Sequence, residues 1–258
     1  MIDKDKIDYY YKIRENRPER TRTLRGYFYF SNDEKDENNI ADDSIFMESY
    51  KLFMKDIDPN YKIKKYQTQI LLVGFSIEPI ILSILGLSAK RIIFIYSDDT
   101  RGECTTIIRY IELIEKKLEL DLKYEFISKD ELYSRKSRFC IDSSLPHSTF
   151  HAINAAVAWE IEENGIPREE ICINVTGGKK SMGNGAYIAA NILNIDTYYV
   201  DFRSYEHDRP TFGTEKLIGL PRIEDIVKSK KLTDSEKKDL SKNLLSFIED
   251  TTLRSDEK

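Results

Sequence analysis

From Thr68 to Leu220, short apolar runs alternate with segments of helical periodicity, and this alternation limits the possible folds more than any other feature. The apolar runs are typical of buried strands and lie at Gln69–Val73, Arg91–Tyr96, Lys123–Ile127, Glu170–Val175 and Thr197–Asp201, with an edge strand within Thr211–Leu220. The helical segments between them are Glu78–Leu87, Cys104–Leu118, a helix from a Ser148 cap to Glu163, and Lys180–Leu193. Because strands that alternate with helices form parallel βαβ units, we predict an α/β protein with a Rossmann-like, mostly parallel sheet and helices on both faces.

The flanking regions have a different character. We divide the chain into an irregular N-terminal extension (1–65), a Rossmann-like domain (66–220), and a C-terminal helix with a charged tail (221–258). The C-terminal helix is predicted over Leu232–Asp250, where apolar residues recur at helical spacing. The last residues are charged and are expected to fray.

The N-terminal extension is polar apart from one helix predicted over Asp42–Asp56. An arginine-rich run, Arg14–Arg25, is interrupted by acidic residues and followed by the aromatic residues 27–30 and a charged stretch, 31–39, that we expect to be a mobile loop. Arginines beside aromatic residues suit a nucleic-acid contact, but a lid or a solvated surface fits equally well. The extension as a whole is therefore interpreted as a lid over the pocket, a dimer contact or an output element.

The composition excludes several classes of protein. With 258 residues, of which 40% are hydrophobic and 33% charged, the chain is expected to be soluble and to bury its own core. It has no apolar stretch long enough to span a membrane and no secretory signal, so we expect a cytoplasmic protein. Cys104, Cys140 and Cys172 form no CxxC pair, which argues against a disulfide framework or a zinc site. The net charge of −5 argues against binding of long nucleic acid but permits a small phosphorylated ligand in a local basic pocket.

Ligands bind open parallel sheets at the carboxyl ends of the strands, and three loops are predicted there. They are Gly74–Glu78 after the first strand, Ser97–Thr100 after the second, and Thr176–Met182 after the fourth. The last of these reads Thr-Gly-Gly-Lys-Lys-Ser-Met and leads into a predicted helix. Two glycines permit close approach of the backbone, while free N–H groups at the helix start and the charges of Lys179 and Lys180 suit a phosphate. The loop is neither a Walker A loop nor a GxGxxG turn, and the alternative is a tight turn with two solvated lysines.

Three segments together resemble a known family. They are Leu72–Pro79, Ile95–Thr100 and Asn174–Met182, followed by the strand that contains Tyr198–Asp201. The arrangement resembles the CARF family, the CRISPR-associated Rossmann fold, over residues 66–220, and its Thr-Gly-Gly-Lys-Lys-Ser-Met motif is the most specific part. Members of this family bind cyclic oligoadenylates made by type III CRISPR complexes, so the resemblance implies the same class of ligand here.

The resemblance also implies a homodimer in which both subunits line one pocket for the ring, with four adenylates as the expected ring size. Some members only sense the ligand, whereas ring nucleases cleave it without a metal through attack of a ribose 2′-OH on the adjacent phosphorus. Lys180 is then the expected main contact to phosphate and transition state, Lys179 assists it, and Ser76 orients phosphate or ribose. No metal or other cofactor is implied. The expected ligand contacts are Gly74, Phe75, Ser76, Ile77, Glu78, Ser97, Asp98, Thr100, Thr176, Gly177, Gly178, Lys179, Lys180, Ser181 and Met182.

Some of these ligand contacts, and several other residues of types that often carry chemistry, have simpler structural interpretations. Ser76 could instead cap the helix that begins near Glu78. Asp98 and Asp99 are more often turn residues than metal ligands. His147 and His151, at i and i+4, could bind zinc, but no third ligand is evident, and surface or capping roles are favoured. His207 is expected in a solvated loop, and Trp159 is expected in core or dimer packing.

Three functions remain open from the sequence. The favoured one is a ring nuclease that ends a type III CRISPR antiviral signal, because fewer than about 40 residues follow Leu220, too few for a separate effector nuclease domain. The second is a non-catalytic sensor module of a larger or partnered effector or regulator. The third is a generic nucleotide-binding Rossmann protein, which the missing GxGxxG turn disfavours.

Overall fold

A computed structural model of the chain describes residues 2–15, 27–28, 40–57, 64–121, 123–132, 134, 137–206, 209–225, 235 and 238. Most of the arginine-rich run, the loop predicted over 31–39, His207 and nearly all of the helix predicted over 232–250 lie outside these residues. The Rossmann-like region predicted over 66–220 falls inside them apart from a few positions.

The centre of the fold is a six-stranded sheet in the order β3-β2-β1-β4-β5-β8. Its strands are β1 (Thr68–Leu72), β2 (Arg91–Ile95), β3 (Glu125–Phe126), β4 (Ile171–Asn174), β5 (Asp196–Phe202) and β8 (Glu215–Leu220). The first five are parallel, and β8 pairs antiparallel with β5 at the edge. The predicted mostly parallel sheet and the predicted edge strand are therefore confirmed.

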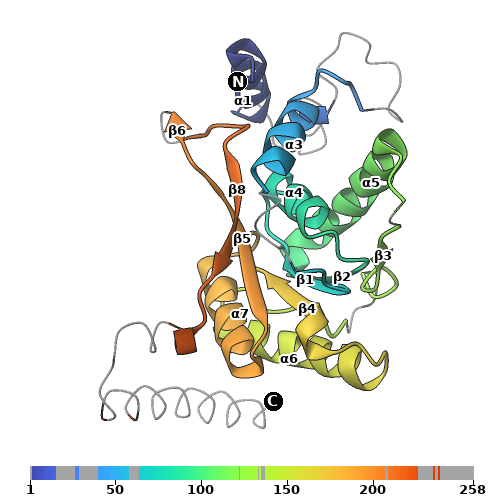
Figure 1. Cartoon of the computed structure of the whole chain (residues 1–258), viewed down its shortest axis with the longest axis vertical. Coiled ribbons are helices and arrows are strands. Elements are labelled where there is room, and N and C mark those ends of the chain that lie inside the picture. Colours follow the sequence, from blue (N-terminus) through green and yellow to red (C-terminus); the bar gives the residue numbers. More distant parts are fainter. Residues whose placement is uncertain are drawn as a thin grey trace.

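Helices cover both faces of this sheet, as predicted (Figure 1). The helices α4 (Glu78–Leu87) and α5 (Arg101–Leu118) lie on one side, and α6 (Pro146–Glu162) and α7 (Lys180–Leu193) lie on the other. Every residue of α4 is buried, because α4 packs against the sheet on one side and against a helix from the N-terminal extension on the other. The bounds predicted for α4 and α7 are confirmed.

Two helix starts differ from the prediction. α6 begins at Pro146 after an extended Leu145, so Ser148 lies inside the helix and does not cap it. Proline presets the backbone angle of a first helical turn and has no N–H to leave unpaired, which accounts for the earlier start. α5 begins at Arg101, directly after a short 3₁₀-helix over Asp98–Thr100, where the sequence predicted only a turn.

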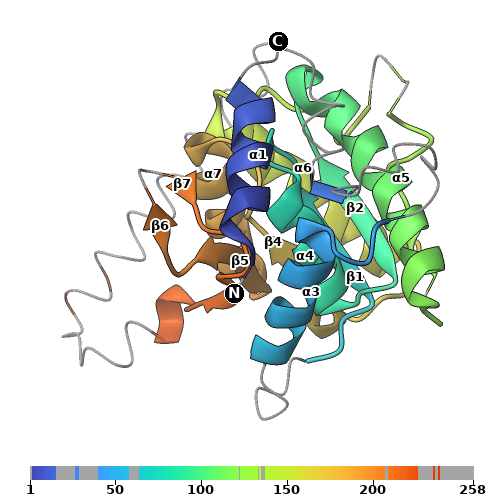
Figure 2. The same ribbon diagram turned by 90° about the horizontal axis from the view of Figure 1, so that it is seen from above.

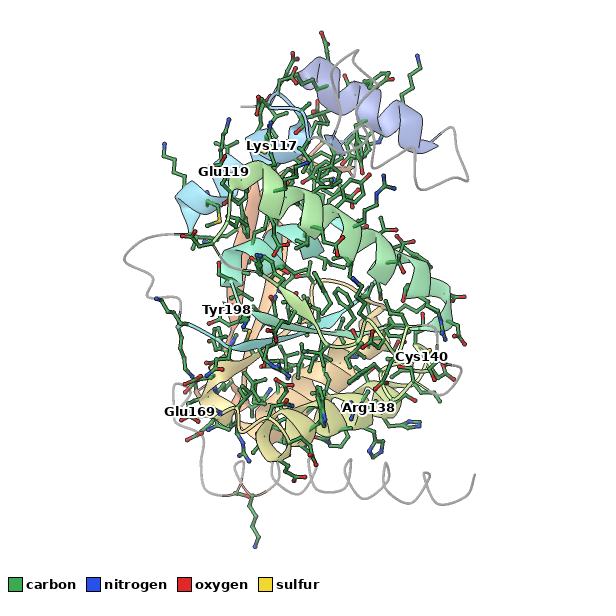
Figure 3. The ribbon with its side chains drawn as sticks, turned by 90° about the vertical axis from the view of Figure 1, so that its right-hand side faces the viewer. Lys117, Glu119, Arg138, Cys140, Glu169 and Tyr198 are labelled. Atoms are coloured by element: carbon green, nitrogen blue, oxygen red, sulfur yellow. The ribbon has the colours of Figure 1, made fainter. Side chains whose placement is uncertain are left out.

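The N-terminal extension contains two helices, α1 (Lys4–Glu15) and α3 (Ile45–Asp56). α3 was predicted, and the Ser44 Oγ caps it by accepting the Met47 N–H at 3.2 Å. Just before it, Asp42 forms an ion pair with Lys117 (2.7 Å), a residue near the C-terminus of α5 that is labelled in Figure 3. α1 was not predicted, because its inward side consists of tyrosines among charged residues rather than an aliphatic stripe.

α1 lies next to a small antiparallel hairpin formed by β6 (Tyr205–Glu206) and β7 (Arg209–Pro210), as Figure 2 shows from above. The buried rings Tyr10 and Tyr11 pack around Phe212, just beyond this hairpin. The described part of the extension therefore belongs to the same hydrophobic core as the sheet. Within the described residues, none of the helices is both long and apolar enough to cross a membrane.

Candidate functional site

The strand order reverses direction at β1, and this reversal defines the ligand crevice of an open α/β sheet. From β1 the chain runs outward to β2 and β3 on one side, and then returns to build β4 and β5 on the other. β1 and β4 are neighbours, with Thr68 opposite Ile171 and Leu71 opposite Asn174, so both strands end at the same level. The loops after β1 and β4 therefore emerge side by side at the switch point, where such folds bind ligands.

These two loops touch backbone to backbone through their glycines. A Cβ atom on Gly74 would lie 2.4 Å from the Gly178 nitrogen, and one on Gly177 would lie 2.2 Å from the Leu72 carbonyl oxygen. Gly178 has a φ of +84°, in the left-handed region that favours glycine. We expected both glycines to let a ligand approach the backbone closely. Gly177 is buried, and its missing side chain instead lets the two loops pack against each other.

The loop after β4 is also fixed by hydrogen bonds at its start. The Thr176 N–H donates to the Asn174 Oδ1 at 2.8 Å, which forms an Asx turn at the strand end. The Val200 N–H donates to the Thr176 Oγ1 at 2.8 Å, which ties the loop to β5. Thr176, an expected ligand contact, thus uses its hydroxyl oxygen within the fold. Asn174 was not among the expected site residues, although an Asn two residues before the Thr-Gly-Gly run is the sequence signal of such a turn.

The helix start that follows presents positive charge to solvent. Lys179 and Lys180 are exposed, and Lys179 is the extended N-cap residue of α7. The first turn of α7 contains no acidic residue, so its backbone N–H groups and the positive end of its dipole are not offset locally. Ser181 donates its hydroxyl to the Ser143 carbonyl at 2.5 Å, and Met182 is buried beneath Gly178. The two lysines are therefore the side chains of this loop best placed for an anion.

The loop after β1 divides into an exposed and a buried part. Phe75 is 50% exposed and Ser76 is exposed, whereas Ile77 and Glu78 are buried. Ile77 is the N-cap of α4, so the interpretation of Ser76 as the cap is wrong. The Glu78 carboxylate accepts a hydrogen bond from the buried Tyr10 hydroxyl of α1. Ser76 and Phe75 thus remain accessible to a ligand, while the side chain of Glu78 points into the protein.

The third expected loop, after β2, is bonded within itself. The Ser97 N–H donates to the Thr100 Oγ1 at 3.0 Å, and both side chains are buried. Arg101 pairs with the exposed Asp98 at 2.6 Å, and this hydrogen bond lowers the pKa of Asp98. The Cys140 thiol, labelled in Figure 3 on the loop before α6, also donates to Asp98 at 3.5 Å. Asp98 is thus paired with Arg101 and Cys140, and Ser97 and Thr100 hydrogen-bond to each other within the loop.

The described residues contain no group of three or more His, Cys, Asp or Glu side chains that could hold a metal ion. His147 and His151 lie in the first turns of α6, with ring centroids 6.4 Å apart. The three cysteines are free thiols, and burial raises the pKa of each of them. Trp159 packs against the core, with the Arg138 guanidinium 4.5 Å from its ring centroid.

Fold and site together define a Rossmann-like α/β protein with a candidate anion site where the loops after β1 and β4 meet. No protein-family model matches the chain, and no curated protein has a matching sequence. Among solved structures, the fold is similar to that of Can2 from Sulfobacillus thermosulfidooxidans in complex with cyclic tetra-adenylate (cA4), with 16% identity and a TM-score of 0.38. The similarity covers 59% of this chain and 33% of that structure, so the chain spans about a third of its length. The function is therefore inferred from the residues of the site.

Proposed function

We propose that this protein binds a cyclic oligoadenylate, with cyclic tetra-adenylate as the first candidate, at the loops after β1 and β4. One observation carries the proposal. The exposed Lys179 and Lys180 stand at the N-terminus of α7, and their loop is in backbone contact with the loop that presents Phe75 and Ser76. Two cations and a set of helix N–H groups therefore belong to one loop, and an exposed aromatic ring and a hydroxyl belong to the loop that it touches.

Each feature of this site suits one part of an adenylate ring. A cyclic oligoadenylate carries one negative phosphodiester per nucleotide, which Lys179, Lys180 and the first N–H groups of α7 can bind as charge-assisted donors. The half-exposed ring of Phe75 offers a flat apolar surface on which an adenine can stack. The hydroxyl of Ser76 can donate to a phosphate oxygen or accept from a ribose hydroxyl.

The proposal includes a homodimer, because a ring with two-fold symmetry is best bound by two identical half-sites. In an isologous dimer each subunit contributes the same patch, so each would supply one set of lysines and one Phe75–Ser76 pair. We place this binding in type III CRISPR signalling within the cytoplasm, on the strength of the Thr-Gly-Gly-Lys-Lys-Ser-Met motif that resembles the CARF family.

We further propose that the protein cleaves the bound ring as a metal-independent ring nuclease. A ribose 2′-oxygen attacks the adjacent phosphorus and loses its proton to water, the bond from phosphorus to the 5′-oxygen breaks, and the leaving 5′-oxygen takes up a proton. The products are a linear oligoadenylate with a 2′,3′-cyclic phosphate at one end and a 5′-hydroxyl at the other. Lys180, assisted by Lys179, stabilises the charge that develops on the phosphate oxygens, and Ser76 holds the reacting groups in line.

A sensor without catalysis is the second candidate, and one contact favours it. Glu78, at the end of the ligand loop, is hydrogen-bonded to Tyr10 in α1, which connects the site to the N-terminal extension. Such a contact gives ligand binding a route to another part of the molecule.

The test incubates the purified protein with cyclic tri-, tetra- and hexa-adenylate in EDTA, resolves the products by chromatography and measures binding by calorimetry. Lys180→Ala should weaken binding by about tenfold or more, because a charge-assisted phosphate contact is lost. The matched control is Lys116→Ala, which removes the same charge from an exposed position on α5 and should leave affinity unchanged. Linear products with a 2′,3′-cyclic phosphate support the ring nuclease, and tight binding without products supports the sensor. If no ring binds, or if both lysine variants bind equally well, the proposed site is wrong.

A further inference from the structure

α1 is held by contacts to three separate parts of the fold. Tyr11 donates its hydroxyl to the Pro210 carbonyl at 2.5 Å, and Lys4 pairs with Glu206 at 3.0 Å, which joins α1 to the hairpin of β6 and β7. Lys6 pairs with Glu48 at 3.0 Å, which joins α1 to α3. The third contact runs to α4.

This third contact is the hydrogen bond from the Tyr10 hydroxyl to the Glu78 carboxylate. Tyr10 is fully buried and Glu78 is 6% exposed, so water does not compete for the bond. The ring of Tyr10 is also packed edge-on against Phe212, at 5.1 Å between centroids, which fixes its orientation. A hydrogen bond is electrostatically stronger in such surroundings than in water, and a buried group that loses its partner is costly.

The position of Glu78 makes this bond important for the ligand loop. Glu78 is the first residue of α4, directly after the loop Gly74–Ile77 that presents Phe75 and Ser76. The N-cap of α4 is Ile77, whose apolar side chain makes no capping hydrogen bond. The loop is therefore fixed at one end by the backbone contact of Gly74 with Gly178, and at the other end by the contact of Glu78 with Tyr10.

We propose that Tyr10 is a positioning residue that couples the loop Gly74–Ile77 to α1 through Glu78. Tyr10 does not touch the ligand and acts by holding the loop in its binding conformation. Because coupling between two sites is reciprocal, a ligand that orders the loop must also stabilise the docking of α1, by the same factor. The identity of that ligand rests on the proposed function, whereas the coupling of Tyr10 to the loop does not.

The first test needs no ligand and compares hydrogen exchange in two matched variants. Tyr10→Phe and Tyr11→Phe each remove one hydroxyl from adjacent rings of the same helix and keep the rings. Tyr10→Phe should speed exchange of amides 75–80 (Pro79 has no N–H) about tenfold, the scale of one buried hydrogen bond, and leave the sheet amides unchanged. Tyr11→Phe should leave amides 75–80 unchanged and affect the amides of Arg209 and Thr211, on either side of Pro210, instead. Equal exchange of amides 75–80 in both variants would overturn the proposal.

Conservative replacement of Glu78 separates coupling from loss of fold. Glu78→Gln keeps an oxygen that can accept the Tyr10 hydroxyl, while Glu78→Ala does not. Exchange of amides 75–80 should stay near the wild-type rate in Glu78→Gln and rise in Glu78→Ala. A rise of the same size in both variants would refute the hydrogen bond as the coupling element.

The second test uses cyclic tetra-adenylate as the probe. Tyr10→Phe should bind it about tenfold more weakly and Tyr11→Phe within about twofold of wild type. A saturating concentration should slow exchange of amides 5–15 in the wild type more than in Tyr10→Phe. If wild-type protein binds the ring but the ring protects α1 equally in both, the coupling is refuted and the proposed function stands. If wild-type protein binds no ring, the proposed function fails, and the ligand-free exchange experiment alone decides the coupling.

Discussion

Replacement of Glu215 by Gln should remove a pH dependence from the stability of this protein. Glu215 is the first residue of β8 and is 3% exposed. Its Oε2 accepts the Gly213 N–H at 2.7 Å, while its Oε1 is buried without a hydrogen-bond partner among the described residues. Burial raises the pKa of Glu215 to about 7. Gln keeps an oxygen for the Gly213 N–H and cannot ionise.

The size of the effect follows from the difference between the folded and unfolded pKa values. In an unfolded chain the pKa of a Glu is about 4.3. Between that value and about 7, the unfolded state has lost the proton that folded Glu215 still holds, so the free energy of unfolding falls as pH rises. At about 1.4 kcal/mol for each pKa unit, the total is about 3 to 4 kcal/mol. Above the folded pKa both states are ionised and the contribution no longer changes.

The assay is urea unfolding of wild type and Glu215→Gln at pH 5, 6, 7 and 8. Other titrating groups contribute equally to both proteins, so the difference between their unfolding free energies isolates Glu215. The stability of the variant relative to wild type should increase by about 2 to 3 kcal/mol from pH 5 to pH 8. If the two stabilities run parallel over this range, Glu215 does not hold a proton in the folded state and the reasoning fails.

Two further predictions concern the ligand loops. Gly177→Ala should cost about 1 to 3 kcal/mol in urea unfolding, because its Cβ would lie 2.2 Å from the Leu72 carbonyl oxygen, and a cost near zero would contradict the packing. Its control, Gly183→Ala in α7, has nothing within 4 Å of the added Cβ and should stabilise by about 0.5 to 1 kcal/mol. Ser76→Ala should lower the rate of ring cleavage more than the affinity for the ring, measured as kcat and Kd, and the reverse result would make Ser76 a binding residue only.

The regular part of the fold was predictable because its signals are local. The apolar runs of β1, β2 and β4 are short and bounded, and α4 and α7 begin and end at the predicted residues. α1 was missed because tyrosines provide its buried side, and tyrosines are common on surfaces too. The start of α6 was missed because Ser148 is a good cap in isolation, and the proline two residues earlier determines the start.

The loops of the candidate site were predictable in place but not in detail. The βαβ pattern predicts that the three loops lie at the carboxyl ends of the strands, whereas the order β2-β1-β4, which brings two of them together, came only from the structure. Which side chains face inward there depends on residues distant in sequence. Glu78 turns away from the loop because Tyr10, 68 residues earlier, accommodates it in the core. Such a pair leaves no periodic pattern in a single sequence.

The contacts of α1 with the hairpin also set an order of events during synthesis. Tyr11 and Pro210 are 199 residues apart, and Lys4 and Glu206 are 202 residues apart. The ribosome releases α1 well before the hairpin, and the surface that receives it is complete only after β7 has left the exit tunnel. Until then the tyrosines of α1 have no partner there, and at about 5 to 20 residues per second this waiting period lasts roughly 10 to 40 seconds. α1 is therefore made long before it can dock on the hairpin, and a factor that shields nascent apolar surface can act on it during this period.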